Sequence, residues 1–159
     1  MILEMNHMSF TVGDIERSVP FYRDLLGLSL VSLASRDRAF SERVTGIPGA
    51  ELRIAYLQAP NAAVELIQYL SPAGLKLDTR TCNIGSAHVC FVVDDFDLLV
   101  GRLRNASVHF AGQPTTVPAG PNLGRQVLYF EDPDGNTIEI FSAGSSTGKL
   151  TPPSGSNVP

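Results

Sequence analysis

The chain has 159 residues, a length that suits one domain or two half-size modules sharing a core and excludes two independent enzymes. Hydrophobic residues make up 43% and charged residues 18% of the sequence, which excludes a disordered or collagen-like chain. The net charge of -4 provides no basic surface for phosphate backbones or anionic lipids, so we expect neither a nucleic-acid nor a membrane partner.

The first elements predicted from hydrophobic periodicity are a strand, a helix and a second strand. Residues 7–12 alternate between polar and apolar side chains, the pattern of a half-buried strand. Asp14 is placed to cap the helix that follows, and Gly27 is placed to end it. Residues 28–35 continue as the second strand.

The rest of the first half predicts a long connection and a hairpin. Residues 36–50 are charged and punctuated by glycine and proline, which favours a connection long enough to close over a site. The apolar pattern resumes over residues 51–57 and 63–70, which predicts two paired strands. The first half therefore follows the order β-α-β-β-β, and residues 71–85 form a linker.

The second half repeats this pattern, including two polar residue types at matching positions. His7 begins the first strand of the first half, and His88 begins the corresponding strand, residues 88–93. Glu65 lies in the last strand of the first half, and Glu139 lies in the last strand of the second. The repeat of a histidine and a glutamate at matching positions indicates an internal duplication.

The duplication defines two modules within one domain, which covers residues 1–143. Module one spans about residues 3–70 and module two residues 86–143, and Tyr56 aligns with Tyr129 between them. The remaining segment, residues 144–159, is rich in serine, glycine and proline, so we expect a flexible tail.

The two histidines and two glutamates are candidate metal ligands. Each glutamate lies between two aliphatic residues, so its side chain points to the opposite face of its strand. If the two modules pair, His7, Glu65, His88 and Glu139 face one cavity. Imidazole and carboxylate together suit Zn²⁺, Ni²⁺, Co²⁺, Mn²⁺ or Fe²⁺, and the ligand types select none of these.

An ordinary structural role is the alternative for each of these residues taken singly. A lone histidine at a strand start is commonly a hydrogen-bonded surface residue, and a lone glutamate among aliphatics commonly lies on a solvated sheet face. The recurrence of both types at matched positions favours the shared site.

Three segments carry a resemblance to a known family over residues 3–143. HMSFTV, HVCFVVDD and above all YFEDPDGNTIEIF resemble the vicinal oxygen chelate superfamily, which includes glyoxalases, bleomycin-resistance proteins and extradiol dioxygenases. The resemblance implies an α+β fold of two paired βαβββ modules, each a curved mixed sheet forming a half-barrel. It also implies a divalent metal held by His7, Glu65, His88 and Glu139.

The ligand set implied by the resemblance is most similar to that of glyoxalase I. We therefore expect a metal-dependent lyase or isomerase that acts on a small metabolite with vicinal oxygens through an enolate-type intermediate. Glu139 is the candidate base, with Glu65 as its counterpart in the first module. The arginine and asparagine pattern with which glyoxalase I binds glutathione is not found, so a glutathione adduct is not the expected substrate.

Two other functions stay open within the same family. An extradiol-type dioxygenase would bind Fe²⁺ through His7, His88 and Glu139 only, and would leave Glu65 off the metal. A non-catalytic binding or resistance protein would hold a small molecule without turnover. Tight metal binding by four protein ligands would contradict the latter.

Residues two positions from a ligand share its face, and this predicts the lining of a substrate cavity. The predicted lining residues are Ser9, Thr11, Ile67, Tyr69, Cys90, Val92 and Phe141. Simple packing inside the half-barrel is the alternative for each. Candidate anion anchors, for which ordinary surface arginine is the alternative, are Arg36, Arg38, Arg43 and Arg125.

Location and assembly follow from what the sequence lacks. No apolar run reaches the roughly 18 residues of a membrane-spanning helix, and the first residues lack signal-peptide features, so we expect a cytoplasmic protein. Cys82 and Cys90 indicate neither a zinc knuckle nor a disulfide framework. The leading strands lack the lysine or proline residues that prevent an edge strand from pairing with another chain. This predicts a two-fold homodimer. Whether the modules pair within a chain or across the dimer stays open.

Overall fold

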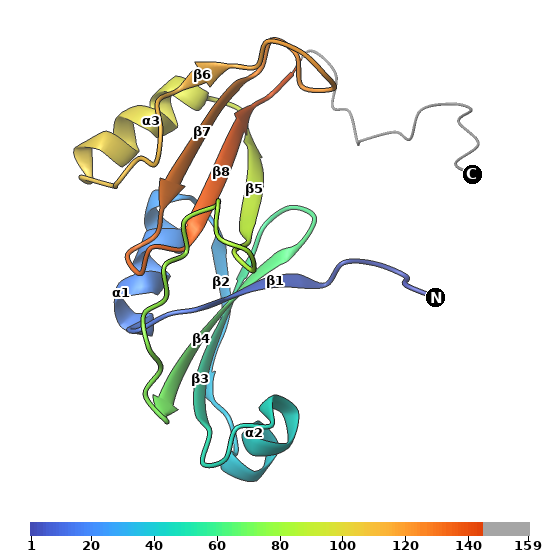
Figure 1. The fold of residues 1–159 in the computed structure, drawn as a ribbon, viewed down its shortest axis with the longest axis vertical. Helices are drawn as coiled ribbons and strands as arrows, with labels where there is room; N and C mark the ends of the chain where they lie inside the picture. Colours follow the sequence, from blue (N-terminus) through green and yellow to red (C-terminus); the bar gives the residue numbers. More distant parts are fainter. Residues whose placement is uncertain (145–159) are drawn as a thin grey trace.

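A computed structural model describes residues 1–144 and shows two modules of four strands each (Figure 1). The tail predicted to be flexible lies outside the described residues, apart from its first residue. Module one contains β1 (His7–Thr11), α1 (Ile15–Pro20), η1 (Phe21–Leu25), β2 (Ser29–Ser35), α2 (Arg38–Thr45), β3 (Glu51–Gln58) and β4 (Ala63–Ser71). Module two contains β5 (His88–Val93), α3 (Phe96–Asn105), β6 (Thr115–Thr116), β7 (Gln126–Glu131) and β8 (Thr137–Ser142).

The two sheets have the same topology. Their strand orders are β1-β4-β3-β2 and β5-β8-β7-β6, and in each the first strand pairs in parallel with the last. The other neighbours pair antiparallel. The prediction of an α+β fold with two βαβββ modules is therefore confirmed.

Local capping explains where the helices begin and end. Asp14 accepts a hydrogen bond from the Glu16 amide at 3.0 Å and so begins α1. Past Pro20 the helix continues as the π-helical turn η1, and Gly27, with φ of 80°, follows its end.

The segment 36–50, which the sequence indicated only as a connection, contains α2. Asp37 caps this helix by accepting from the Phe40 amide at 2.9 Å. Gly46, at φ of 69°, ends it in the left-handed conformation. No helix among residues 1–144 is long and apolar enough to cross a membrane.

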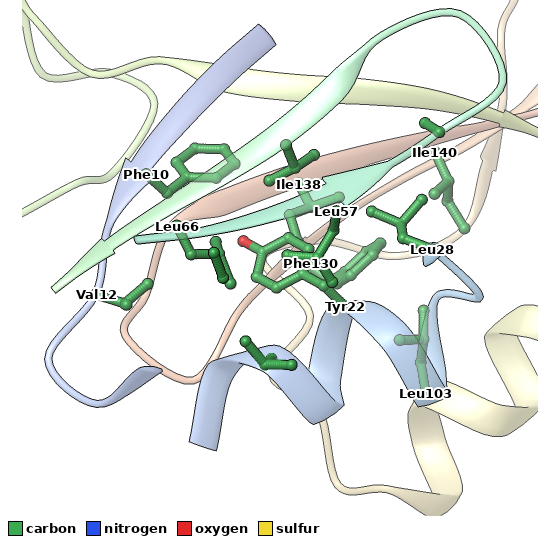
Figure 2. Packing of buried hydrophobic residues seen from close by; sticks show 14 of the residues in the cluster. Phe10, Val12, Tyr22, Leu28, Leu57, Leu66, Leu103, Phe130, Ile138 and Ile140 are labelled. Carbon is green, nitrogen blue, oxygen red and sulfur yellow. The ribbon is translucent and has the colours of Figure 1, made fainter. Parts of the chain in front are cut away.

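Both modules contribute to one buried core (Figure 2). The buried side chains include Tyr22, Leu57 and Leu66 from module one and Phe130 and Ile138 from module two. In Figure 1 the modules lie one above the other, and α1 lies beside the turn between β7 and β8. This packing leaves the opposite faces of the sheets available for a site.

A buried hydrogen bond joins α1 and η1 to that turn. The Tyr22 hydroxyl donates to Asp132 Oδ2 at 2.9 Å, and both residues are buried. Asp132 Oδ1 also accepts from the amides of Asp134 and Asn136 at 2.9 and 2.8 Å. Burial, followed by the nearby Asp132 charge, raises the pKa of Tyr22 well above its usual value, so its hydroxyl stays a donor. The DPDGN sequence is thus a structural turn that fastens module two to module one.

Replacing Asp132 should destabilise the fold strongly. Asp132→Ala removes an acceptor from four donors, among them the buried Tyr22 hydroxyl, so we expect a loss of about 2 to 3 kcal/mol in the free energy of unfolding. Urea denaturation followed by circular dichroism measures this loss. Asp97→Ala on the exposed side of α3 is the matched control and should change stability little. Equal stability of both variants would contradict the role of the turn.

Candidate metal and substrate site

Each sheet brings one histidine and one glutamate together on the same face. In module one, His7 Nε2 lies 3.3 Å from Glu65 Oε2, because β1 and β4 are parallel neighbours. In module two, His88 Nε2 lies 3.2 Å from Glu139 Oε2, across the corresponding pair β5 and β8. The two carboxylates are only 6% and 7% exposed, although their faces carry polar residues. A buried carboxylate needs a polar or cationic partner, so both His–Glu pairs are suited to bind such a partner.

A tyrosine completes each pair. Tyr56 lies opposite Glu65 in the register of β3 and β4, and its ring meets the His7 ring edge to face at 5.7 Å. A hydrogen bond to Glu65, then burial, raises the pKa of the Tyr56 hydroxyl. The hydroxyl is therefore a donor to the carboxylate at neutral pH.

The second module repeats this contact. Tyr129 lies opposite Glu139 and meets the His88 ring at 5.2 Å. Burial, then a hydrogen bond to Glu139, raises the pKa of Tyr129 to about 12. Sequence reasoning did not place the two tyrosines in the site. Their alignment between the modules, on the same strand face as the glutamates, was the signal that could have found them.

His7 is oriented for binding through Nε2. Its Nδ1 lies 2.8 Å from the side-chain oxygen of Asn6. Because an amide oxygen only accepts, His7 donates through Nδ1 in this contact, and Nε2, which faces Glu65, is the ring nitrogen left to bind a metal. Such second contacts commonly orient metal-binding histidines.

The four predicted ligands form two pairs in the single chain and not one cluster. Within residues 1–144 no group of three or more histidine, cysteine, aspartate or glutamate side chains is close enough to hold a metal ion. Two imidazole nitrogens and two carboxylates still fit a divalent ion by their chemistry. Each module therefore supplies one half of such a donor set.

The histidine faces of both leading strands are open. His7, Ser9 and Thr11 are exposed, while the alternate residues of β1 point into the core. His88, Cys90 and Val92 are likewise exposed on β5, and Val92 is 60% accessible.

The predicted lining residues do not line a single cavity. Ser9, Thr11 and Tyr69 border a cavity of about 530 Å³ between β1 and the segment 73–87. Val92 borders a second cavity of about 360 Å³, which lies between the modules. Neither cavity includes Ile67, Cys90 or Phe141.

Cys90 lies opposite Glu139 in the register of β5 and β8. Although Cys90 is exposed as a residue, partial burial of its sulfur, then the charge of Glu139, raises the pKa of the Cys90 thiol to about 12. The thiol therefore stays protonated at neutral pH and is a weak nucleophile.

Removing the tyrosine hydroxyls should weaken metal binding without abolishing it. Tyr56→Phe and Tyr129→Phe each keep the ring and delete one donor to a glutamate, so we expect about a 10-fold loss of metal affinity. Competition with a coloured chelator measures the affinity. Tyr69→Phe is the control, because Tyr69 lies on the same face of β4 as Glu65 but, among the described residues, makes no hydrogen bond or ring contact with either pair. If all three variants bind alike, the tyrosines do not support the ligands.

Comparisons with known proteins agree on one family. The family model described as Glyoxalase/Bleomycin resistance protein/Dioxygenase superfamily matches residues 4–140. A 2-epi-5-epi-valiolone epimerase from Actinomyces sp is 28% identical over 143 residues, which cover 87% of this chain and 78% of the epimerase. A probable lactoylglutathione lyase from Synechocystis sp. is 24% identical and covers 87% of this chain and 95% of the lyase.

Solved structures agree with the fold. A glyoxalase family protein from Bacillus cereus superposes with a TM-score of 0.76 at 24% identity, over 89% of this chain and 95% of that protein. A glyoxalase I from Leishmania major superposes with a TM-score of 0.61 at 22% identity, over 89% of this chain and 87% of that one.

Proposed function

The chain belongs to the Glyoxalase/Bleomycin resistance protein/Dioxygenase superfamily, and from this premise we propose that it is a divalent-metal-dependent lyase or isomerase. Its substrate is a small metabolite with two adjacent oxygens. The observation that carries this proposal is the duplicated set of histidine, buried glutamate and tyrosine on one face of each sheet. The relatives that are epimerases and lyases support the same class of reaction.

We propose that the complete site forms between two chains. The two His–Glu pairs do not meet among the described residues of one chain, and the strand faces that carry them are exposed. A two-fold homodimer would join His7 and Glu65 of one chain to the His88 and Glu139 of the other. Each dimer then contains two equivalent sites.

The residues of the chain have separate tasks in this proposal. When bound, the metal supplies Lewis-acid stabilisation of the charge that develops on the substrate oxygens. Glu139 accepts the proton that leaves the substrate carbon, at the carboxylate that faces His88. Tyr129 donates to this carboxylate and limits its rotation. Burial of Glu139 excludes bulk water from the proton transfer.

The equal construction of the two pairs favours four ligands over three. Glu65 lies as close to His7 as Glu139 does to His88, and both carboxylates are buried to the same extent. A ring-cleaving dioxygenase would need only three of the four residues and would leave Glu65 unused. Oxygen uptake with catechols by the Fe²⁺-loaded protein would support that alternative.

Metal reconstitution followed by proton exchange tests the proposal. Protein stripped with a chelator is reloaded with Zn²⁺, Ni²⁺, Co²⁺, Mn²⁺ or Fe²⁺, and elemental analysis gives the stoichiometry. Loaded protein is then incubated in D₂O with a panel of α-hydroxyketones and α-ketoaldehyde thiol adducts, and NMR follows the α-proton signal. We expect exchange that requires metal. Ligand binding without exchange on any compound would instead support a binding or resistance protein.

A further inference from the structure

Arg36 lies on the same sheet face as the first His–Glu pair. It directly follows β2, and its amide donates to the Leu52 carbonyl at 2.9 Å, which extends the pairing of β2 with β3. Residues opposite each other across these strands share a face, and the face alternates along each strand. The register of Ser32 with Tyr56 therefore places Arg36, four residue pairs further along, on the face of Tyr56.

Arg36 is a partly buried residue, and its guanidinium has no carboxylate at ion-pair distance within residues 1–144. Four other arginines of module one do have one: Arg17 contacts Asp134, Arg23 contacts Asp24, Arg38 contacts Glu51, and Arg53 contacts Glu16. A cation that is partly withdrawn from water without a counter-charge is costly, which favours an anion from outside the chain.

The shared face links Arg36 to the candidate site through Tyr56. Tyr56 lies opposite Glu65 in the register of β3 and β4, and its ring contacts the His7 ring.

The second module has no arginine at this position. Its corresponding residue is Val117, whose amide donates to the Arg125 carbonyl as that of Arg36 donates to Leu52. Arg125 directly precedes β7, and its guanidinium contacts Asn122 at 3.4 Å. By alternation Arg125 lies on the face of Tyr129, so module two also has an arginine beside its pair, but on the other strand of the ladder. The histidine, glutamate and tyrosine thus occupy matching positions in the two modules, whereas the arginines do not.

We propose that Arg36 binds an anionic group of the substrate, a carboxylate or a phosphate, while the adjacent oxygens of the same molecule face the His–Glu pairs. The substrate class is therefore an acid or phosphate ester with vicinal oxygens. A guanidinium holds such oxyanions through two parallel hydrogen bonds, which lysine cannot form. This assignment rests on the proposed function, because it names the substrate class of that site.

Hydroxamates test the assignment because they chelate a metal through two adjacent oxygens. The Co²⁺-loaded protein is titrated with butyrohydroxamate, which has an uncharged chain, and with succinate monohydroxamate, which ends in a carboxylate. A third titration uses phosphoglycolohydroxamate, which ends in a phosphate. The visible spectrum of Co²⁺ reports binding. We expect at least one charged compound to bind about 10-fold more tightly than butyrohydroxamate, and the tighter of the two identifies carboxylate or phosphate.

Two variants distinguish recognition by Arg36 from the general electrostatic attraction of a positively charged surface residue. Arg36→Gln should lose the preference for the charged compound and keep the affinity for butyrohydroxamate. Arg43→Gln, which removes an exposed arginine of α2, should keep the preference. An equal affinity of the wild-type protein for all three compounds would overturn the assignment and leave the proposed function standing.

A measurement without metal keeps the two proposals distinguishable. The Arg36 Nε–Hε signal of the metal-free protein, identified by its loss in Arg36→Gln, is followed by NMR during titration with acetate and with inorganic phosphate. We expect a saturable shift with one of them. A shift would support Arg36 whether or not the protein binds metal, and the absence of any shift would overturn Arg36. Failure of the same protein to bind metal on reloading would count against the metal-dependent function alone.

Discussion

A one-to-one mixture of two variants that each bind almost no metal should recover about a quarter of the wild-type metal content. The first variant, His7→Ala/Glu65→Gln, destroys the module-one half of the site, and the second, His88→Ala/Glu139→Gln, destroys the module-two half. In a mixed dimer, one site combines both damaged halves and the other combines both intact halves. Half of the dimers in a random mixture are mixed, so one site in four is complete.

Elemental analysis after subunit exchange measures this recovery. The variants are mixed, incubated in mild denaturant, returned to buffer, and loaded with Zn²⁺, and native mass spectrometry verifies that mixed dimers have formed. Each variant alone, treated in the same way, is the control. Mixed dimers that bind no metal would show that the four ligands meet within a chain, or that these residues are not the ligands. Full metal content in either variant alone would show that the metal does not bind at these positions.

The second large effect is expected for Glu139→Gln. The amide keeps an oxygen that can contact the metal but cannot accept a proton, so turnover should fall by about 10²- to 10⁴-fold. Metal content should fall less than in His7→Ala or His88→Ala, since each histidine variant loses a ligand completely. Proton exchange in D₂O and elemental analysis on the same samples measure the two effects.

The matched variant is Glu65→Gln, which makes the same change in the other module. If Glu139 is the base, Glu65→Gln should lose metal affinity to a similar degree but retain more turnover. The opposite ranking would transfer the role of base to Glu65. Unchanged proton exchange in Glu139→Gln at full metal occupancy would rule out Glu139 as the base.

Alternation along the strands explains why the shared face of each histidine and its glutamate could be predicted from sequence. A period of two residues determines which face each side chain occupies, so His7 and Glu65 could be assigned to one face before their strands were known to be neighbours. The parallel pairing of β1 with β4 then brings their side chains to 3.3 Å. The same reasoning holds for His88 and Glu139.

The separation of the two pairs could not be predicted in the same way. It depends on how the modules pack, and that packing rests on contacts such as Tyr22 with Asp132, which are 110 residues apart in the chain. Helix α2 was missed for a different reason, because glycine and proline around it obscured a short helix. Asp37 as its cap and Gly46 as its end were the local signals.

The long separation of Tyr22 and Asp132 also has a consequence for biosynthesis. During synthesis on the ribosome, module one is complete before β7 and β8 leave the exit tunnel. The apolar side chains that will pack against Phe130 and Ile138 therefore stay exposed to solvent until then. Contacts this distant in sequence also close slowly. Nascent chains stalled before residue 130 should therefore bind chaperones, and release of the last strands should end that binding.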